Sequence, residues 1–356
     1  MKARLIEADD EYAAVEQLHA NGLTDGLPVV TPTPERVQQM ILASGMDGDQ
    51  LLGEVGPANA AATLEKVAIN AVMAGCLPDY FPVVVAAVRA ACQPMFDLSA
   101  QQTTTHSLTP IVIVNGPARE ACGIASGVGA LGSGFRANAA IGRALRLVMT
   151  NIGGATPGVS DMAVLGQAGK FAACFAEAEE ESPYVPLSVS RGFEPGASVV
   201  TLVSVDAPHS IIASPDGDDP DAAERIVRVI AHSIANAGAN NTYGGHGSPL
   251  VILNPNHARI MAKRYGTRDA LAERLCEVAV TPRRVLTQYA FPWLEPGDAD
   301  DLVPAIGSPE NLIIAVAGGE GVYSAVANSW GGGENGVRPV SQEIQLDQFC
   351  ELPSNR

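Results

Sequence analysis

The stretch GIASGVGALGSGFRANAAIGRALRLVMTNIGGATPG, residues 123–158, joins a glycine-rich loop to an amphipathic helix. The small residues between 127 and 134 cannot form a core of their own. They are expected to allow positive φ angles or the close approach of another group. After them, apolar side chains recur every three or four residues, which predicts a helix over residues 137–151 with one buried stripe. That stripe consists of Ala137, Ala140, Ile141, Ala144, Leu145 and Val148.

Arg136 stands where this loop meets the helix, while Arg143 and Arg146 lie off the apolar stripe. Free N–H groups at a helix start, the helix dipole and an arginine together form an arrangement that binds carboxylate or phosphate. A glycine-rich turn that packs tightly against a sheet fits the same residues, so both interpretations stay open. The ligand-binding residues expected here are Gly132, Ser133, Gly134, Arg136 and Asn138.

The loop contains the letters GVGALG at 127–132, which match the pattern GxGxxG. A dinucleotide-binding fold needs this pattern directly after a strand and an acidic residue some 20 positions later. About ten residues separate it from the preceding apolar run, and the acidic residue is missing. The pattern therefore does not predict a nucleotide cofactor, and no cofactor or metal is expected.

The length and composition predict a globular α/β protein with two lobes. The chain has 356 residues, 47% of them hydrophobic and 17% charged, and single cores stop growing near about 250–300 residues. We expect a mixed α/β fold in which the glycine-rich loop and its helix lie at the cleft between the lobes. The lobes are expected to span residues 1–196 and 197–356.

The net charge of −17 disfavours nucleic acid and anionic membrane surfaces as partners. No apolar run is long enough for a membrane span, and acidic residues stand where a secretory signal would be apolar. These features predict a cytoplasmic protein whose six cysteines are mostly buried thiols. A small anionic ligand would then need a local positive pocket.

Four residues are candidates for the catalytic groups. His106 follows three threonines and precedes a predicted strand at 111–114, where it could exchange protons. Cys76 precedes a predicted helix start, and Cys174 has Lys170 close in sequence, so each could be a thiolate nucleophile. Glu177, beside the apolar strand, is the preferred general base. A structural histidine, inert buried thiols and a solvated acidic face fit the same residues.

Further ligand contacts are expected at the ends of the predicted strands, because open α/β sheets tend to bind ligands there. Thr24 and Asp25 lie in an exposed loop, and both a turn and a ligand contact fit Asp25. The additional residues predicted to bind the substrate are Asn115, Lys170, Asn254, His257, Gly318 and Gly319.

The phrases TDGLPVV, AGCLPDYFPVVVAAV, TTTHSLTPIVIVNGP, GFRANAAIGRALRLVMTNIGGATPG and FAACFAEAEEESP resemble a bacterial family found beside the UGSC proteins, a selenocysteine-or-cysteine family. The resemblance runs from about residue 24 to residue 339. It implies a catabolic or redox setting and gives no mechanism and no residue roles.

These patterns lead to the hypothesis of an enzyme, a lyase or hydrolase, that acts on a small carboxylated or otherwise anionic metabolite by proton transfer or through a cysteine nucleophile. One alternative is a non-catalytic ligand-binding subunit of a multi-protein enzyme. Another is a metal-dependent enzyme that uses His106, His209, His246, His257 and Glu177, although no HxH or HExxH spacing supports it. The candidate protein partners are a second copy of the chain, in a homo-oligomer, and a UGSC-type protein.

Overall fold

The computed structural model describes residues 4–214, 219–243, 245–294 and 297–345. The first part of the chain contains α1 (Glu11–Ala20), α2 (Pro34–Ser44), β1 (Leu51–Val55), β2 (Ala60–Thr63), α3 (Leu64–Met73), η1 (Pro78–Tyr80), α4 (Phe81–Ala91), η2 (Pro94–Phe96), α5 (Leu98–Thr103), β3 (Thr109–Asn115), α6 (Ala118–Ala121), α7 (Arg136–Asn151), η3 (Ala168–Lys170), β4 (Cys174–Ala176), α8 (Leu187–Ser190) and β5 (Val199–Val205).

The second part contains β6 (His209–Ile212), α9 (Ala222–Ile234), η4 (Asn240–Thr242), β7 (Leu250–Leu253), α10 (Pro255–Tyr265), α11 (Arg268–Val278), β8 (Val280–Pro282), α12 (Arg283–Tyr289), β9 (Leu302–Pro304), η5 (Pro309–Asn311), β10 (Ile313–Val316), β11 (Tyr323–Ala327) and β12 (Val340–Glu343). The mixed α/β class predicted from the sequence is confirmed.

Two four-stranded sheets form the centre of the molecule. The first has the order β12-β5-β3-β4, with β3 and β4 parallel and β5 antiparallel to both of its neighbours. The second has the order β10-β7-β11-β6, with β10 and β7 parallel and β11 antiparallel to β7 and β6. Two small hairpin sheets, β1-β2 and β8-β9, lie outside them.

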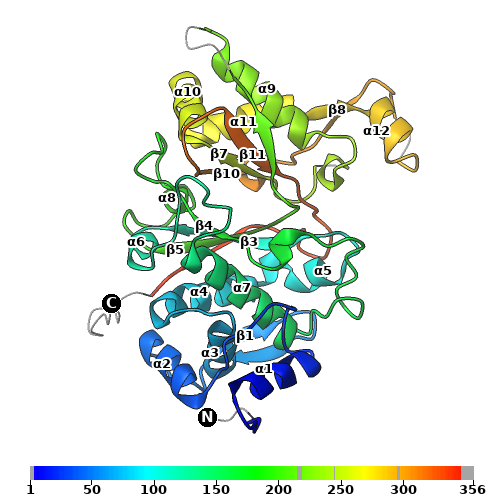
Figure 1. Cartoon of the computed structure of the whole chain (residues 1–356). Helices are drawn as coiled ribbons and strands as arrows, with labels where there is room; N and C mark the ends of the chain where they lie inside the picture. The colour runs from blue at the N-terminus through cyan, green and yellow to red at the C-terminus, as the bar shows by residue number, and fades with distance from the viewer. Residues whose placement is uncertain (1–3, 215–218, 244, 295–296, 346–356) are drawn as a thin grey trace.

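The two central sheets pack face to face, and helices cover the outer face of each, so the centre of the fold has four layers. α1, α2, α3 and the β1-β2 hairpin lie beyond α4 and α7 (Figure 1). Figure 1 shows α9, α10 and α11 on one side, then the two sheets, then α4 and α7 on the other side. The alternation of side chains along the strands confirms this arrangement. On β3, Val112 and Val114 join the core under the helices, while Ile111 and Ile113 join the core shared by the sheets.

On β7 the same alternation separates the two faces of the second sheet. Leu250 and Ile252 pack in the shared core, and Val251 and Leu253 pack under α9, α10 and α11. Strands covered on both faces read as continuous apolar runs, as these do. The shared core makes the two sheets one packed body.

The predicted lobe boundary at residue 196 does not separate the two sheets. Strand β5 follows that boundary in sequence, yet it pairs along its whole length with β3. Strand β12, near the end of the described chain, also joins β5 in the first sheet. The prediction missed this because hydrogen bonding between strands depends on tertiary pairing, which a composition shift near a glycine does not reveal.

The central helix was predicted well. α7 covers the expected range, begins at Arg136, and buries every residue of the predicted stripe. It packs against α3, α4 and β4, so Leu147, Met149 and Arg146 are buried as well. A helix covered on several sides has little exposed surface, and an arginine on it needs a partner.

Within the described ranges, no single helix is long and apolar enough to cross a membrane. The helical segments Pro78–Ala91 and Pro94–Thr103, bent at 75°, pass the same test as a pair on length and composition alone.

Candidate functional site

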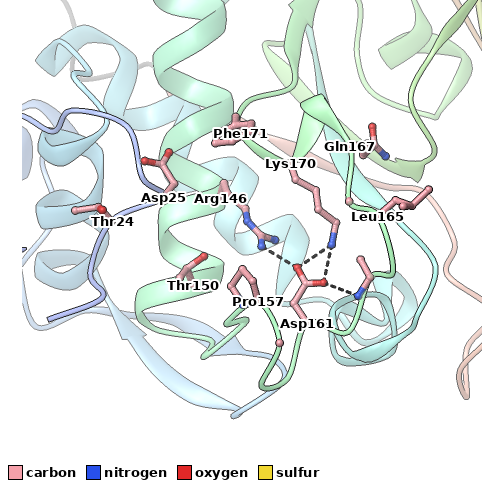
Figure 2. A pocket seen from close by; sticks show the side chains of 13 residues that line it. Thr24, Asp25, Arg146, Thr150, Pro157, Asp161, Leu165, Gln167, Lys170 and Phe171 are labelled. Carbon is pink, nitrogen blue, oxygen red and sulfur yellow. Dashed lines mark hydrogen bonds and ion pairs between the residues drawn. The ribbon is translucent and has the colours of Figure 1, made fainter. Parts of the chain in front are cut away.

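A cavity of about 480 Å³ opens between α7, the loop after α1 and residues 157–171. Ligand cavities usually measure about 300–1,000 Å³. Figure 2 shows the polar side chains that face it from these three segments. They are Thr24, Asp25, Arg146, Thr150, Asp161, Gln167 and Lys170.

α7 organises one wall of the cavity. Arg143 and Arg146 are three residues apart and therefore lie on neighbouring turns of one face. Arg143 donates to both carboxylate oxygens of Asp25, from Nε and Nη2, each at 2.7 Å. This bidentate pair fixes the loop that carries Thr24 against the helix. Burial alone would raise the pKa of Asp25, but the hydrogen bonds and charge of Arg143 outweigh it and lower that pKa.

The opposite wall is a turn that places Asp161. The carbonyl of Thr156 accepts from the amides of Val159, Ser160 and Asp161. Gly158 has a φ of +74°, which a side chain would disfavour at this position. The Asp161 carboxylate therefore points back toward α7 (Figure 2).

Asp161 holds two cations side by side on the cavity wall. Lys170 Nζ lies 2.8 and 2.7 Å from its two oxygens, and Arg146 Nη2 lies 2.9 Å from Oδ2. The side chains are nearly buried: Lys170 is 11% exposed, Arg146 8% and Asp161 4%. Arg146 also donates from Nη1 to Gln102. We call these three residues the Arg146–Asp161–Lys170 triad.

The pKa values of the triad follow from burial and charge. Burial tends to raise the pKa of Asp161, but the hydrogen bonds and charges of Lys170 and Arg146 more than reverse this and lower it. Burial lowers the pKa of Lys170, and the contacts to Asp161 offset only part of that effect. Asp161 is therefore a carboxylate at neutral pH, and Lys170 releases its proton more readily than an ordinary lysine.

The local charge around the cavity is opposite to that of the whole chain. Arg143, Arg146 and Lys170 face Asp25 and Asp161, which leaves one positive charge in excess. The chain as a whole carries −17. Two of the three Nζ protons of Lys170 are used on Asp161, so one remains for a ligand.

The residues predicted in the glycine-rich loop do not line this cavity. Arg136 is exposed, and its Nε and Nη2 donate to the carbonyl of Gly75 at 3.2 and 3.0 Å. Asn138 instead fixes the loop from within, through bonds to both backbone groups of Ala125 and to the carbonyl of Ala130. The predicted ligand-binding residues of the loop are exposed at the surface: Gly132, Ser133 and Gly134.

The same loop contacts the second sheet. The Gly318 amide donates to the carbonyl of Ser126 at 2.8 Å. A Cβ on Gly319 would lie 2.4 Å from Cγ2 of Val128. Gly319 thus allows this loop to pack closely against the segment that follows β10. A Cβ on Gly127 or Gly134 of the glycine-rich loop would meet nothing within 4 Å, so close packing does not account for these two glycines.

His106 forms a separate polar contact. Its Nε2 lies 2.7 Å from Oδ1 of Asp206, and its Nδ1 is buried without a partner among the described residues. Segment 164–167 separates it from the cavity, because Val164 and Gln167 bond to the carbonyls of Thr105 and Ser107. The structure therefore does not bring His106 together with Lys170.

Cys76 and Cys174 lack the features of nucleophiles, which corrects that prediction. The Cys76 thiol is buried and donates to the Ala140 carbonyl, and burial raises its pKa to about 12. Burial also raises the pKa of Cys174. Neither thiol lines the cavity, and a protonated thiol is a poor nucleophile. Cys350 lies outside the described residues.

Glu177 is a buried structural carboxylate and not an available base. It is 0% exposed and pairs with Arg268 at 2.9 Å. Asn115 Nδ2 and the amide of Leu187 each donate to its Oε2 at 2.6 Å. Asn115 is thereby also placed in this network and does not line the cavity. The prediction failed because the sequence did not show that Arg268 would reach Glu177 from α11.

Asn254 and His257 are likewise structural. Asn254 caps α10 by accepting from the His257 amide at 2.9 Å. The ring nitrogens of His257 contact Ser324 Oγ at 2.8 Å and the carbonyl of Ala213 at 2.9 Å. With both nitrogens satisfied, His257 has no free group for a ligand.

Among the predicted residues, Lys170 lines the cavity, whereas Arg146 and Asp161 were not predicted. The sequence signal that could have indicated Arg146 was its spacing of three residues from Arg143, on a helix whose other positions are mostly apolar. Among the residues that the structure describes, no three or more His, Cys, Asp or Glu side chains could together hold a metal ion. A scan against models of known protein families and a search of curated proteins each found no match to this chain.

Proposed function

We propose that the cavity binds a small carboxylated or otherwise anionic metabolite, and that the protein is a proton-transfer enzyme of the lyase or hydrolase type. The observation that carries this proposal is the Arg146–Asp161–Lys170 triad, which presents two cations and one carboxylate on a cavity wall. Arg146 and the third Nζ proton of Lys170 are the groups that would bind the anion.

The triad favours an anion for electrostatic reasons. Each cation is nearly buried, so its interaction with a bound anion is screened less than on an open surface. Asp161 compensates one of the two positive charges, and a ligand carboxylate would compensate the other. Thr24 and Thr150 add hydroxyl groups at the same cavity, which suit a ligand that carries hydroxyl or carbonyl oxygens.

Lys170 is the group proposed to move the proton. Because burial lowers its pKa, the neutral amine is more populated near neutral pH than for an exposed lysine. Once the third Nζ proton has been released to solvent, the amine lone pair would take a proton from the carbon next to the ligand carboxylate, which Arg146 still holds. The C–H electron pair would move into the carboxylate, where Arg146 stabilises the added negative charge. Lys170 then holds the proton as an ammonium and can return it.

Hydrogen exchange on bound ligands tests this proposal. Small carboxylates such as lactate, succinate, malate and citrate are incubated with the protein in D₂O, and deuterium at the carbon next to the carboxylate is followed by NMR. We expect protein-dependent exchange in at least one of them, and its loss in Lys170→Met. Lys263→Met, on an exposed lysine of α10, is the matched control.

Binding and catalysis are separated by the same experiment. A non-catalytic ligand-binding subunit would bind the carboxylate through Arg146 and Lys170 without exchanging any hydrogen. Absence of binding to every carboxylate tested, or exchange that persists in Lys170→Met, would contradict the proposal.

A further inference from the structure

A second cavity, of about 300 Å³, lies at one end of the strands of the second sheet. Its walls come from segments 245–248, 307–311 and 331–338. The first two precede the parallel strands β7 and β10, and the third follows β11, which runs antiparallel to β7. The topology therefore brings all three segments together at the same end of these strands.

Glycines let these three backbones come together. A Cβ on Gly331 would lie 2.2 Å from the amide nitrogen of Gly247, and one on Gly245 would lie 2.8 Å from that of Gly307. Gly245 and Gly247 also have positive φ angles, of +70° and +84°. A side chain at these positions would push the segments apart, so the cavity wall consists largely of peptide groups. Such concave backbone surfaces can present several N–H groups to an anion.

Two side chains at this cavity have unused hydrogen-bonding capacity. Ser248 is 1% exposed, and its hydroxyl has no hydrogen-bond partner within the described part of the chain. A buried hydroxyl without a partner is costly, which points to a group that is bound in the functional state. Arg338 is exposed, and across the described ranges its guanidinium makes no ion pair or side-chain hydrogen bond. Its backbone amide is fixed by the carbonyl of Met95 at 3.0 Å.

We infer that this cavity is a second ligand site, which binds an oxyanion of the phosphate type. The Arg338 guanidinium supplies the charge and a fork of donors, and the glycine segments supply the close backbone approach. The Ser248 hydroxyl is covered in the ligand-free protein, and a rotation about χ1 would turn it toward the bound oxyanion as a further donor. The volume exceeds that of a phosphate ion alone, so the natural ligand is a small phosphorylated molecule. The site shares no residue with the first cavity and is independent of the function proposed for it.

Inorganic phosphate is the probe for this inference, with binding measured by isothermal titration calorimetry on the full chain. We expect Arg338→Gln to weaken phosphate binding by about tenfold or more, since a hydrogen bond to a charged group is lost. Arg264→Gln, on an exposed arginine of α10, should leave the affinity unchanged. The titrations are repeated in the Lys170→Met background, where Arg338→Gln should cause the same loss of affinity, which separates this site from the first cavity.

Ser248→Ala distinguishes a ligand-binding serine from a structural one through two measurements, the melting temperature and phosphate binding. Removing a buried hydroxyl without a partner should leave the melting temperature of the ligand-free protein unchanged or higher. The same substitution should weaken phosphate binding, because the bound ion loses a donor. Failure of the unaltered protein to bind phosphate at millimolar concentration would overturn the inference. So would an affinity that Arg338→Gln and Ser248→Ala both leave unchanged.

Discussion

Lys170 and Asp161 form the contact on which the proposed chemistry depends. The chain has four lysines, so ¹⁵N-lysine labelling gives four side-chain signals at most. Because burial lowers the pKa of Lys170, its Nζ should lose its proton at a lower pH than an ordinary exposed lysine does. The neutral amine therefore appears as the pH rises through this lowered pKa, and any reaction that needs a base should rise over the same range.

Asp161→Asn provides the matched perturbation for this NMR titration. The carboxylate supports the charged form of Lys170, and removing it leaves Arg146 as an uncompensated neighbour. We expect the pKa of Lys170 to fall further in this variant. A Lys170 signal that titrates at the pKa of an ordinary lysine, or that shifts to higher pH in Asp161→Asn, would contradict the assigned electrostatics.

The cysteines give a second prediction at the residue scale. Burial raises the pKa of Cys76 to about 12, whereas Cys92 and Cys276 are partly exposed and have pKa values raised to about 11. We therefore expect iodoacetamide to label Cys92 and Cys276 before Cys76 and Cys174, as followed by peptide mass spectrometry. Fast labelling of Cys76 or Cys174 in the folded protein would restore the thiolate hypothesis.

At the scale of elements, α7 was the feature that the sequence predicted best. Its range and apolar stripe follow from a periodicity that local sequence carries. The sequence did not show which part of α7 lines the cavity. Arg136 is satisfied by a nearby carbonyl, Gly75, while Arg146, three turns later, meets Asp161 from a turn that has no periodic signal. Contacts between distant segments are what local patterns omit.

Gly142 tests how tightly α7 is packed against the start of β4. Changing a glycine inside a helix to alanine usually stabilises a protein, by about 1 kcal/mol. Here a Cβ would lie 2.5 Å from the amide nitrogen of Ala173, a backbone atom. We expect Gly142→Ala to lower the free energy of unfolding by about 1–3 kcal/mol in urea titrations.

Gly127→Ala is the control for this packing, since a Cβ there would meet nothing within 4 Å. It should change the free energy of unfolding by less than about 0.5 kcal/mol. Equal stability of the Gly142→Ala variant and the unaltered protein would show that α7 is not held against residue 173.

At the scale of the whole molecule, the four layers could be only partly predicted. Apolar runs such as Leu250–Leu253 indicate strands covered on both faces. Such apolar runs do not indicate which elements cover the two faces of the sheet. Packing of one sheet on the other, and the return of β12 to the first sheet, depend on shape matching between distant segments.

The Glu177–Arg268 pair connects the two halves of this body. Glu177 follows β4 of the first sheet, and Arg268, on α11, also bonds to Ile314 of β10. Glu177→Gln would leave Arg268 buried without a counter-charge, which typically costs about 3–5 kcal/mol. We expect a loss of that size in the free energy of unfolding, measured by urea denaturation.

Glu181→Gln is the control for the buried pair, because Glu181 forms an exposed ion pair with Arg259 at 3.5 Å. Its substitution should cost less than about 1 kcal/mol. If Glu177→Gln were no more destabilising than Glu181→Gln, the buried pair would not hold the two halves together as described.

A crystal structure obtained after soaking with a mixture of small carboxylates would show whether the Arg146–Asp161–Lys170 triad binds a small anion. We expect a ligand carboxylate within hydrogen-bond distance of Arg146 and of Lys170 Nζ, in the cavity beside α7. A cavity that holds only water, while carboxylates occupy the glycine-rich loop near Arg136 instead, would contradict it.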